Sequence, residues 1–148
     1  MDGVIFVGLQ ASGKTSFYLN EFYRTHIRLS MDMLRTRHRE SLLIDACLAS
    51  KQPCVIDNTN PTIANRESYI RKFRANRFDV VGYYFQSSLN ECLERNSKRD
   101  GKCRIPDVGV RGTYNKLELP KYAEGFDRLY YVAMKESRFI IKEWIDEV

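Results

Sequence analysis

Eight residues near the start of the chain have the types and spacing needed to bind the phosphates of a nucleotide. Residues 8–15 read Gly-Leu-Gln-Ala-Ser-Gly-Lys-Thr, which fits the pattern G-x-x-x-x-G-K-[ST], and an apolar run at 4–7 precedes them. The two glycines let the backbone approach a phosphate closely, and the loop amides then point at it. The residues that we expect to bind a nucleoside triphosphate are Gly8, Ala11, Ser12, Gly13, Lys14, Thr15 and Ser16.

Two side chains of this loop predict chemistry at the bound phosphates. The Lys14 ammonium can neutralise the β- and γ-phosphates, and the Thr15 hydroxyl can be a ligand of Mg²⁺. The loop alone does not specify a kinase, because GTPases, ATPases and nucleotide-binding regulators share it. No N-K-x-D tetrad, which would read guanine, follows the fourth predicted strand, and this disfavours a GTPase.

A carboxylate and a guanidinium follow the second predicted strand, 27–29. Asp32 and Arg35 are three residues apart, so they share a face if Asp32 opens a helix. A carboxylate there can accept the proton of an attacking hydroxyl, and the arginine can hold an acceptor phosphate. An ordinary helix N-terminus with a surface arginine has the same local pattern, so both interpretations remain open.

The third predicted strand, 54–56, runs into the polar turn Asp57-Asn58-Thr59-Asn60-Pro61. An acid at the end of such a strand commonly supports the metal or its waters. Asx residues also stabilise turns without any further role. Arg66 lies one to two helical turns further on and is a candidate to face the ligand crevice.

A basic segment begins one helix after the fourth predicted strand. Residues 95–104 hold five Lys or Arg against Asp100, and Arg95 and Arg99 project from one helical face at i and i+4. Such a segment, at about 95–106, suits a mobile lid whose arginines neutralise charge that develops during phosphoryl transfer. A solvated basic face is the alternative.

The composition bounds the class of protein. The chain has 148 residues, 43% hydrophobic and 29% charged, which is the usage of one globular domain and excludes disordered and fibrous classes. No apolar run approaches the roughly 20 residues that cross a bilayer. The four cysteines and two histidines lack the spacing of a zinc site, so reduced thiols are expected. We expect a single cytoplasmic domain over 1–148.

Strand and helix patterns alternate along the chain. Strands are expected at 4–7, 27–29, 54–56, 80–85 and 126–132, and helices at 15–24, 32–50, 62–76, 89–98 and 107–117. The segment 139–141 either extends the sheet edge or starts a last helix. This alternation predicts an α/β fold of three layers, in which helices flank a central, mainly parallel sheet and a small basic lid covers the site.

Taken together, these motifs resemble the kinase domain of polynucleotide 5′-hydroxyl kinases, particularly the phage type, within the P-loop kinases. The resemblance spans roughly residues 4–134. It rests on the phosphate loop, on Asp32-x-x-Arg35, on the 57–61 turn and on Arg95-Asn96-Ser97-Lys98-Arg99. The loop is generic, whereas the other three segments, in this order and spacing, are much more specific.

The resemblance implies roles for particular residues. Asp32 would be the general base for the 5′-hydroxyl, and Arg35 would grip the phosphate next to the acceptor nucleoside. Arg95 and Arg99 would clamp the donor phosphates. The 57–60 turn is similar to the family's acceptor-site element, in which either Asp57 or Asn58 takes the position of the family's acid. No D-x-D-x-T/V phosphatase motif appears, so 3′ end-healing is not expected.

The expected function is transfer of the γ-phosphate of ATP, or another nucleoside triphosphate, to a 5′-hydroxyl end of DNA or RNA in nucleic-acid repair. Mg²⁺ would be the metal, and Lys14, Asp32 and Arg99 would be catalytic. A kinase for a nucleoside or another small hydroxyl metabolite is the second hypothesis, and a non-catalytic nucleotide-binding switch is the third. A nucleoside-monophosphate kinase is disfavoured because a phosphate acceptor needs no general base.

Overall fold

Strands and helices alternate in the computed structural model, which describes residues 1–86 and 88–145. In chain order the elements are β1 (Asp2–Val7), α1 (Lys14–Glu21), β2 (Ile27–Leu29), α2 (Met31–Leu34), α3 (Arg37–Ser50), β3 (Cys54–Ile56), α4 (Ile63–Ala75), β4 (Asp79–Phe85), α5 (Leu89–Ser97), the 3-10 turn η1 (Gly101–Cys103), α6 (Asp107–Lys116), the 3-10 turn η2 (Tyr122–Glu124), β5 (Arg128–Lys135) and β6 (Arg138–Glu143).

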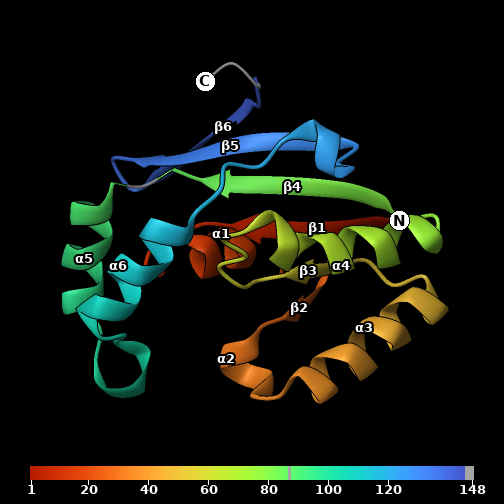
Figure 1. Ribbon diagram of the computed structural model, residues 1–148, viewed down its shortest axis with the longest axis horizontal. Helices are drawn as coiled ribbons and strands as arrows, with labels where there is room; N and C mark the ends of the chain where they lie inside the picture. The colour runs from red at the N-terminus through yellow and green to blue at the C-terminus, as the bar shows by residue number, and fades with distance from the viewer. Residues whose placement is uncertain (87, 146–148) are drawn as a thin grey trace.

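The strands of the described chain form one sheet in the order β2-β3-β1-β4-β5-β6 (Figure 1). Every neighbouring pair from β2 to β5 is parallel, and β6 runs antiparallel to β5 at the edge. The predicted mainly parallel sheet is therefore confirmed. Because parallel strands end at the same edge, the loop after β1 and the turn after β3 meet there, where open α/β sheets bind ligands.

Helices cover both faces of the sheet, and the alternating side chains of β1 show why. Phe6 packs on the face of α1, with its ring centroid 5.9 Å from that of Phe17. Ile5 belongs to the core on the other face, which includes Phe73 of α4 and Ile44 of α3. A strand segment buried on both faces must be apolar, as residues 4–7 of β1 are. The three-layer expectation is thus confirmed.

The helices α5 and α6 lie side by side at the end of the sheet where the parallel strands finish (Figure 1). Cys92 of α5 and Val110 of α6 are fully buried against Leu9 of the phosphate loop. The basic segment that is predicted as a lid therefore connects two helices, α5 and α6, which pack directly against the phosphate loop. Within the described part of the chain, no helix is both long and apolar enough to cross a membrane.

One helix is expected over 32–50, but the structure has two. The helix α2 ends at Arg35, whose φ of 71° leaves the helical region, and α3 begins after Thr36. The Thr36 hydroxyl accepts a hydrogen bond of 3.2 Å from the amide of Arg39, which caps the N-terminus of α3. The segment 139–141 belongs to strand β6, so the sheet-edge option is correct.

Candidate functional site

The loop between β1 and α1 wraps around the side chain of Lys14. The Lys14 ammonium donates hydrogen bonds to the carbonyls of Gly8, at 3.0 Å, and Leu9, at 2.6 Å, and lies 3.5 Å from Ser12 Oγ. The Gly8 amide in turn donates to the Thr59 carbonyl at 3.0 Å. The loop is therefore closed around its lysine and joined to the turn that follows β3.

A glycine is required where the loop enters α1. Gly13 has a φ of 99°, and a β-carbon there would lie 2.9 Å from the Met134 side chain of the β5–β6 hairpin. No acidic residue occupies the first turn of α1, where Thr15 and Ser16 are exposed. Ala11 also has positive φ, at 62°. The loop amides and the positive end of the helix dipole thus remain suited to an anion.

The electrostatic surroundings of Lys14 bring several predicted residues together. The pKa of Lys14 is lowered to about 8, mainly by burial, and the Arg99 guanidinium contributes in the same direction. The Asp57 and Asp32 carboxylates oppose this shift by raising the Lys14 pKa. Charges from the turn after β3, from α2 and from the basic segment therefore all act on the Lys14 ammonium. A phosphate beside Lys14 would favour the charged amine.

The Asp57 carboxylate faces the phosphate loop. Its Oδ2 atom accepts hydrogen bonds from Thr15 Oγ1, at 3.1 Å, and from Arg28 Nε, at 2.7 Å. Arg28 Nη2 also donates to Thr15 Oγ1 at 3.2 Å. Asp57 is buried, with 2% of its side chain exposed. The hydroxyl and carboxylate of this pair are hard oxygen ligands, which Mg²⁺ prefers.

The structure describes no group of three or more His, Cys, Asp or Glu residues that could hold a metal by themselves, in 1–86 and 88–145. Mg²⁺ in phosphoryl-transfer sites usually takes one or two protein oxygens and completes its shell with waters and substrate phosphates. The pair of Thr15 and Asp57 therefore fits a magnesium ion that arrives with a nucleotide.

The side chain of Asn58 faces away from the loop, toward α2 and α3. Its carbonyl oxygen accepts from the amide of Met31 at 2.9 Å, and its amide nitrogen donates to Glu40 Oε2 at 3.0 Å. Glu40 Oε1 accepts from the Tyr69 hydroxyl at 2.8 Å and from Arg37 Nη1 at 3.0 Å. Burial and the Glu40 carboxylate raise the pKa of Tyr69 to about 12, so its hydroxyl keeps the proton it donates.

Asp32, in the short helix α2, and Arg35, the residue that directly follows this helix, are both exposed. The helix begins at Met31, the residue that Asn58 holds by its backbone amide. Arg35 is the residue at which α2 ends, so the two predicted acceptor residues stand at the two ends of one turn of helix. Their side chains are accessible to a ligand that approaches from solvent.

The two lid arginines have different surroundings. Arg95 Nη1 donates to the carbonyl of Ala11 at 2.7 Å, so it is anchored on the phosphate loop. Arg99 is exposed and makes one weak contact, of 3.4 Å, to the Cys103 carbonyl. Between them, the fully buried Asn96 binds both the amide and the carbonyl of Ile105, which closes the base of the segment.

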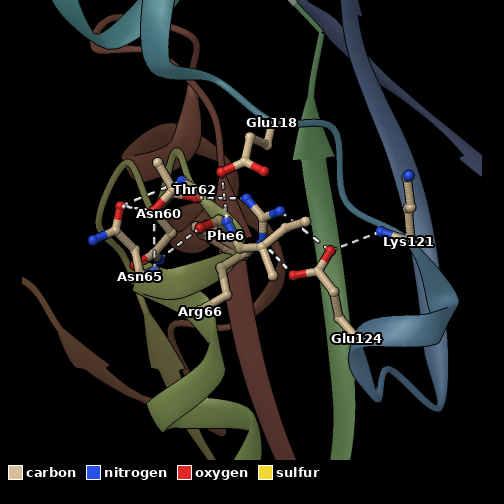
Figure 2. A network of polar contacts seen from close by, with 9 residues as sticks. Phe6, Asn60, Thr62, Asn65, Arg66, Glu118, Lys121 and Glu124 are labelled. Carbon is tan, nitrogen blue, oxygen red and sulfur yellow. Dashed lines mark hydrogen bonds and ion pairs between the residues drawn. The ribbon is translucent and has the colours of Figure 1, made fainter.

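Arg66 does not face the ligand crevice. It is fully buried, and its Nε and Nη2 donate to the Glu124 carboxylate at 2.8 and 3.2 Å (Figure 2). Its Nη1 donates to the Asn60 carbonyl at 2.9 Å, and the Asn60 amide donates to the Phe6 carbonyl at 2.8 Å. We expected Arg66 to contact the substrate, but its guanidinium lies in the core. There it connects the 57–61 turn to η2 and, through Asn60, to β1.

A cavity of about 620 Å³ lies beside Asn58, between α3 and α4. Glu40 and Tyr69 form part of its wall, and the cations on its lining are Arg37, Lys72 and Lys116. A volume of this size holds a nucleotide-sized ligand. The excess of cations favours an anionic one.

Three residues that organise the site were missed in the sequence. Arg28 is a lone cation in a three-residue strand, and Glu40 is a buried acid on the inner face of α3. Asn96 lies among charged residues and looks like a surface amide. A charged residue between two apolar ones is a signal for Arg28 alone, whereas Glu40 follows Arg37-His38-Arg39 and looks like a surface acid.

Comparison with known proteins finds curated relatives among the polynucleotide phosphatase/kinases and solved structures with a similar fold. The chain is 25% identical over 136 residues to the bifunctional polynucleotide phosphatase/kinase of Schizosaccharomyces pombe, which confirms the resemblance to polynucleotide kinases. That match covers 89% of this chain and 33% of the relative, so the chain spans about a third of the relative's length.

The solved structures show the fold. Kti12 of Chaetomium thermophilum, determined in complex with ADP-AlF3, has a TM-score of 0.67 at 16% identity and covers 88% of each chain. A sugar kinase of Janibacter sp. HTCC2649 has a TM-score of 0.66 at 16% identity, over 90% of this chain and 85% of that one. The fold is therefore that of the P-loop kinases.

A family model described as an AAA domain matches residues 37–111, from the start of α3 into α6. These residues supply the acid and amide after β3, the basic segment and its supporting helices. The phosphate loop, which precedes the matched region, has the strand, glycines and lysine that such a nucleotide-binding domain needs. Since the match covers just over half of the sequence, the chain belongs to the AAA domain family of P-loop proteins.

Proposed function

We propose that the chain is a kinase that transfers the γ-phosphate of ATP, or another nucleoside triphosphate, to the 5′-hydroxyl end of DNA or RNA. One observation carries this proposal. Two successive residues of one turn face opposite halves of the site: Asp57 contacts Thr15 of the phosphate loop, and Asn58 holds Met31, the residue before Asp32. A donor phosphate and a hydroxyl acceptor placed by these groups would meet at this turn.

On the donor side, the loop amides and Lys14 bind the phosphates. A magnesium ion held by Thr15 and Asp57 would neutralise charge on the β- and γ-phosphates. Arg95 is already fixed against the loop, whereas the exposed Arg99 is free to reach the transferring group. Guanidinium groups aimed at the equatorial oxygens stabilise the charge that develops there.

On the acceptor side, Asp32 is the general base. As the 5′ oxygen forms its bond to the γ-phosphorus, the bond from that phosphorus to the bridging oxygen breaks. The nucleoside diphosphate leaves with that electron pair, and the hydroxyl proton passes to the Asp32 carboxylate. A positioned base of this kind contributes roughly 10²–10⁴-fold.

Arg35, at the other end of α2, binds the phosphate that follows the acceptor nucleoside. The cavity beside Asn58, with Arg37, Lys72 and Lys116 on its lining, offers the next polyanionic stretch of the strand a basic surface. Both features support a polynucleotide acceptor over a small neutral one. The exposure of Asp32 supports it too, because a strand end can reach it from solvent.

The test is a series of acceptors: a nucleoside, its 3′-monophosphate, and 5′-hydroxyl oligomers of increasing length. Wild-type kcat/KM should rise along the series. Arg35→Ala should lower kcat/KM strongly for the 3′-monophosphate and the oligomers, and barely for the nucleoside. Asp32→Asn should abolish transfer to all of them and leave nucleotide binding intact.

Arg24→Ala is the matched control, because Arg24 is an exposed arginine between α1 and β2, at the opposite edge of the sheet. It should leave the whole series unchanged. Equal efficiency on the nucleoside and the oligomers would refute the polynucleotide acceptor. It would favour a kinase for a small hydroxyl metabolite.

A further inference from the structure

Arg28 holds the two oxygens that the proposed metal site requires. It is the middle residue of β2, and its register with Val55 turns its side chain to the α1 face of the sheet. The guanidinium contacts Asp57 Oδ2 at 2.7 Å and Thr15 Oγ1 at 3.2 Å. The same two groups also contact each other. One guanidinium therefore bridges the hydroxyl and the carboxylate that fit Mg²⁺.

This contact is a largely buried ion pair. Arg28 exposes 19% of its side chain and Asp57 only 2%. A carboxylate so far from water needs a positive partner, and removing one member of a buried pair leaves the other charge uncompensated. Arg28 is thus the cation that forms a direct ion pair with Asp57.

A divalent ion at these oxygens would meet the guanidinium at close range. Thr15 Oγ1 gives its proton to Asp57 and accepts from Arg28, so one lone pair remains for a metal. An ion on that lone pair would lie within roughly 5 Å of the guanidinium, where like charges repel strongly in a partly buried site. The ion would also take over the neutralisation of Asp57.

We propose that Arg28 is an internal competitor of the divalent metal: its guanidinium occupies the Thr15–Asp57 pair, and binding of the metal with the nucleotide displaces it. Arg28 is then a positioning residue that sets how much metal the enzyme requires. The exposed part of its side chain gives it a path away from the pair. The inference rests on the nucleotide and metal half of the proposed function and does not depend on the acceptor.

The first experiment measures metal affinity directly. Mn²⁺ is titrated into protein saturated with ADP, and free Mn²⁺ is followed by electron paramagnetic resonance. Arg28→Gln should bind Mn²⁺ at least about tenfold more tightly than the wild type, because a nearby positive charge is removed. Arg24→Gln, which changes the net charge equally at an exposed arginine, should match the wild type. Unchanged or weaker Mn²⁺ binding in Arg28→Gln overturns the proposal.

The second experiment uses thermal unfolding, which needs no activity. Without metal, Arg28→Gln should melt about 5–10 °C below the wild type, because Asp57 loses its partner. With Mg²⁺ and ADP, the variant should recover most of this difference, since the metal replaces the missing cation. A merely structural role for Arg28 predicts the same loss with and without Mg²⁺, and that result contradicts the proposal.

A double variant covers the case in which Arg28→Gln does not fold without metal. Arg28→Gln with Asp57→Asn leaves no unpaired charge, so it should fold without metal and lose the extra Mg²⁺-dependent stabilisation. Should the double variant keep that stabilisation, the metal does not act at this pair. Because no acceptor is present in these measurements, they succeed or fail independently of the polynucleotide assignment.

Discussion

The Glu40 carboxylate accepts a hydrogen bond of 3.0 Å from the side-chain amide of Asn58. This contact fixes the amide with its oxygen toward Met31, where it accepts the first free N–H of α2. Glu40 is itself held by Tyr69 and Arg37. The position of the proposed base thus depends on Glu40, a buried acid in α3.

We predict that Glu40→Gln weakens binding of the acceptor and leaves binding of the nucleotide donor unchanged. One oxygen of the side chain becomes an N–H₂ group, which cannot accept from Asn58 or from Arg37 and Tyr69. Loss of such a charge-assisted bond is worth roughly 1.5–3 kcal/mol, so KM for an oligonucleotide should rise about 10- to 100-fold. Steady-state kinetics against the oligomer and the nucleotide separate the two effects.

The control for this prediction is Glu67→Gln, the same change at an exposed glutamate of α4. It should alter neither KM. An equal rise in KM for nucleotide and acceptor in Glu40→Gln would mean that the network supports the whole site and not the acceptor half.

We predict that Lys14→Met abolishes turnover and stabilises the nucleotide-free protein. Burial lowers the pKa of Lys14 to about 8, so at pH 7 the folded state carries a charged amine that it disfavours. Removing it should raise the free energy of unfolding by on the order of 2 kcal/mol. Urea unfolding of both proteins at pH 7 measures this gain.

The stability that Lys14→Met gains over the wild type should become smaller as the pH rises above about 8. Below about pH 8 the amine is protonated in both states, so the cost is fully present. Between about pH 8 and the ordinary lysine pKa, the unfolded state holds a proton that the folded state has lost, and the wild type gains stability. Lys98→Met, at an exposed lysine, should show neither effect. A Lys14→Met protein less stable than the wild type at pH 7 contradicts the prediction.

We predict that Arg99→Ala lowers turnover about 10²-fold, the loss typical of a group that stabilises transferring charge. The melting temperature should not change, because the side chain is exposed and its one contact is long. Lys98→Ala is the neighbouring control and should have little effect. Wild-type turnover in Arg99→Ala would identify 95–106 as a solvated basic face.

We predict that Arg66→Ala destabilises the fold by about 3–5 kcal/mol, because Glu124 is left buried and unpaired. Replacing both members, with Arg66→Met and Glu124→Leu, should cost less than Arg66→Ala alone. At temperatures where each variant is folded, KM for the acceptor should stay near the wild-type value. A selective loss of acceptor binding in a stable Arg66→Ala protein would restore Arg66 as a substrate ligand.

The sequence predicts the sheet and most helices because their patterns are local. β2 and β3 occur at the expected residues, and the loop between β1 and α1 follows from its glycines and lysine. The break between α2 and α3 was not predicted, because it depends on a positive φ at Arg35, a residue that ordinarily continues a helix. No propensity signals that conformation in an arginine.

The candidate site was predicted as a set of residues but not as a set of contacts. Asp57 and Asn58 looked interchangeable in the sequence, and only the twist of the chain after β3 turns one to the loop and the other to α2. Arg66 looked like a crevice residue because its partner, Glu124, is 58 residues away. Contacts between residues so far apart in the chain form only in the folded structure, so local sequence patterns do not predict them.

The position of β1 in the middle of the sheet affects when the phosphate loop can fold during synthesis. β1 is the first strand of the chain, yet both of its neighbours, β3 and β4, come later, and β4 ends at Phe85. During synthesis the phosphate loop therefore leaves the ribosome long before the strands that shape it. Such distant pairings make folding slow. A nucleotide that binds the phosphate loop would stabilise the nascent domain only after the chain has emerged past β4.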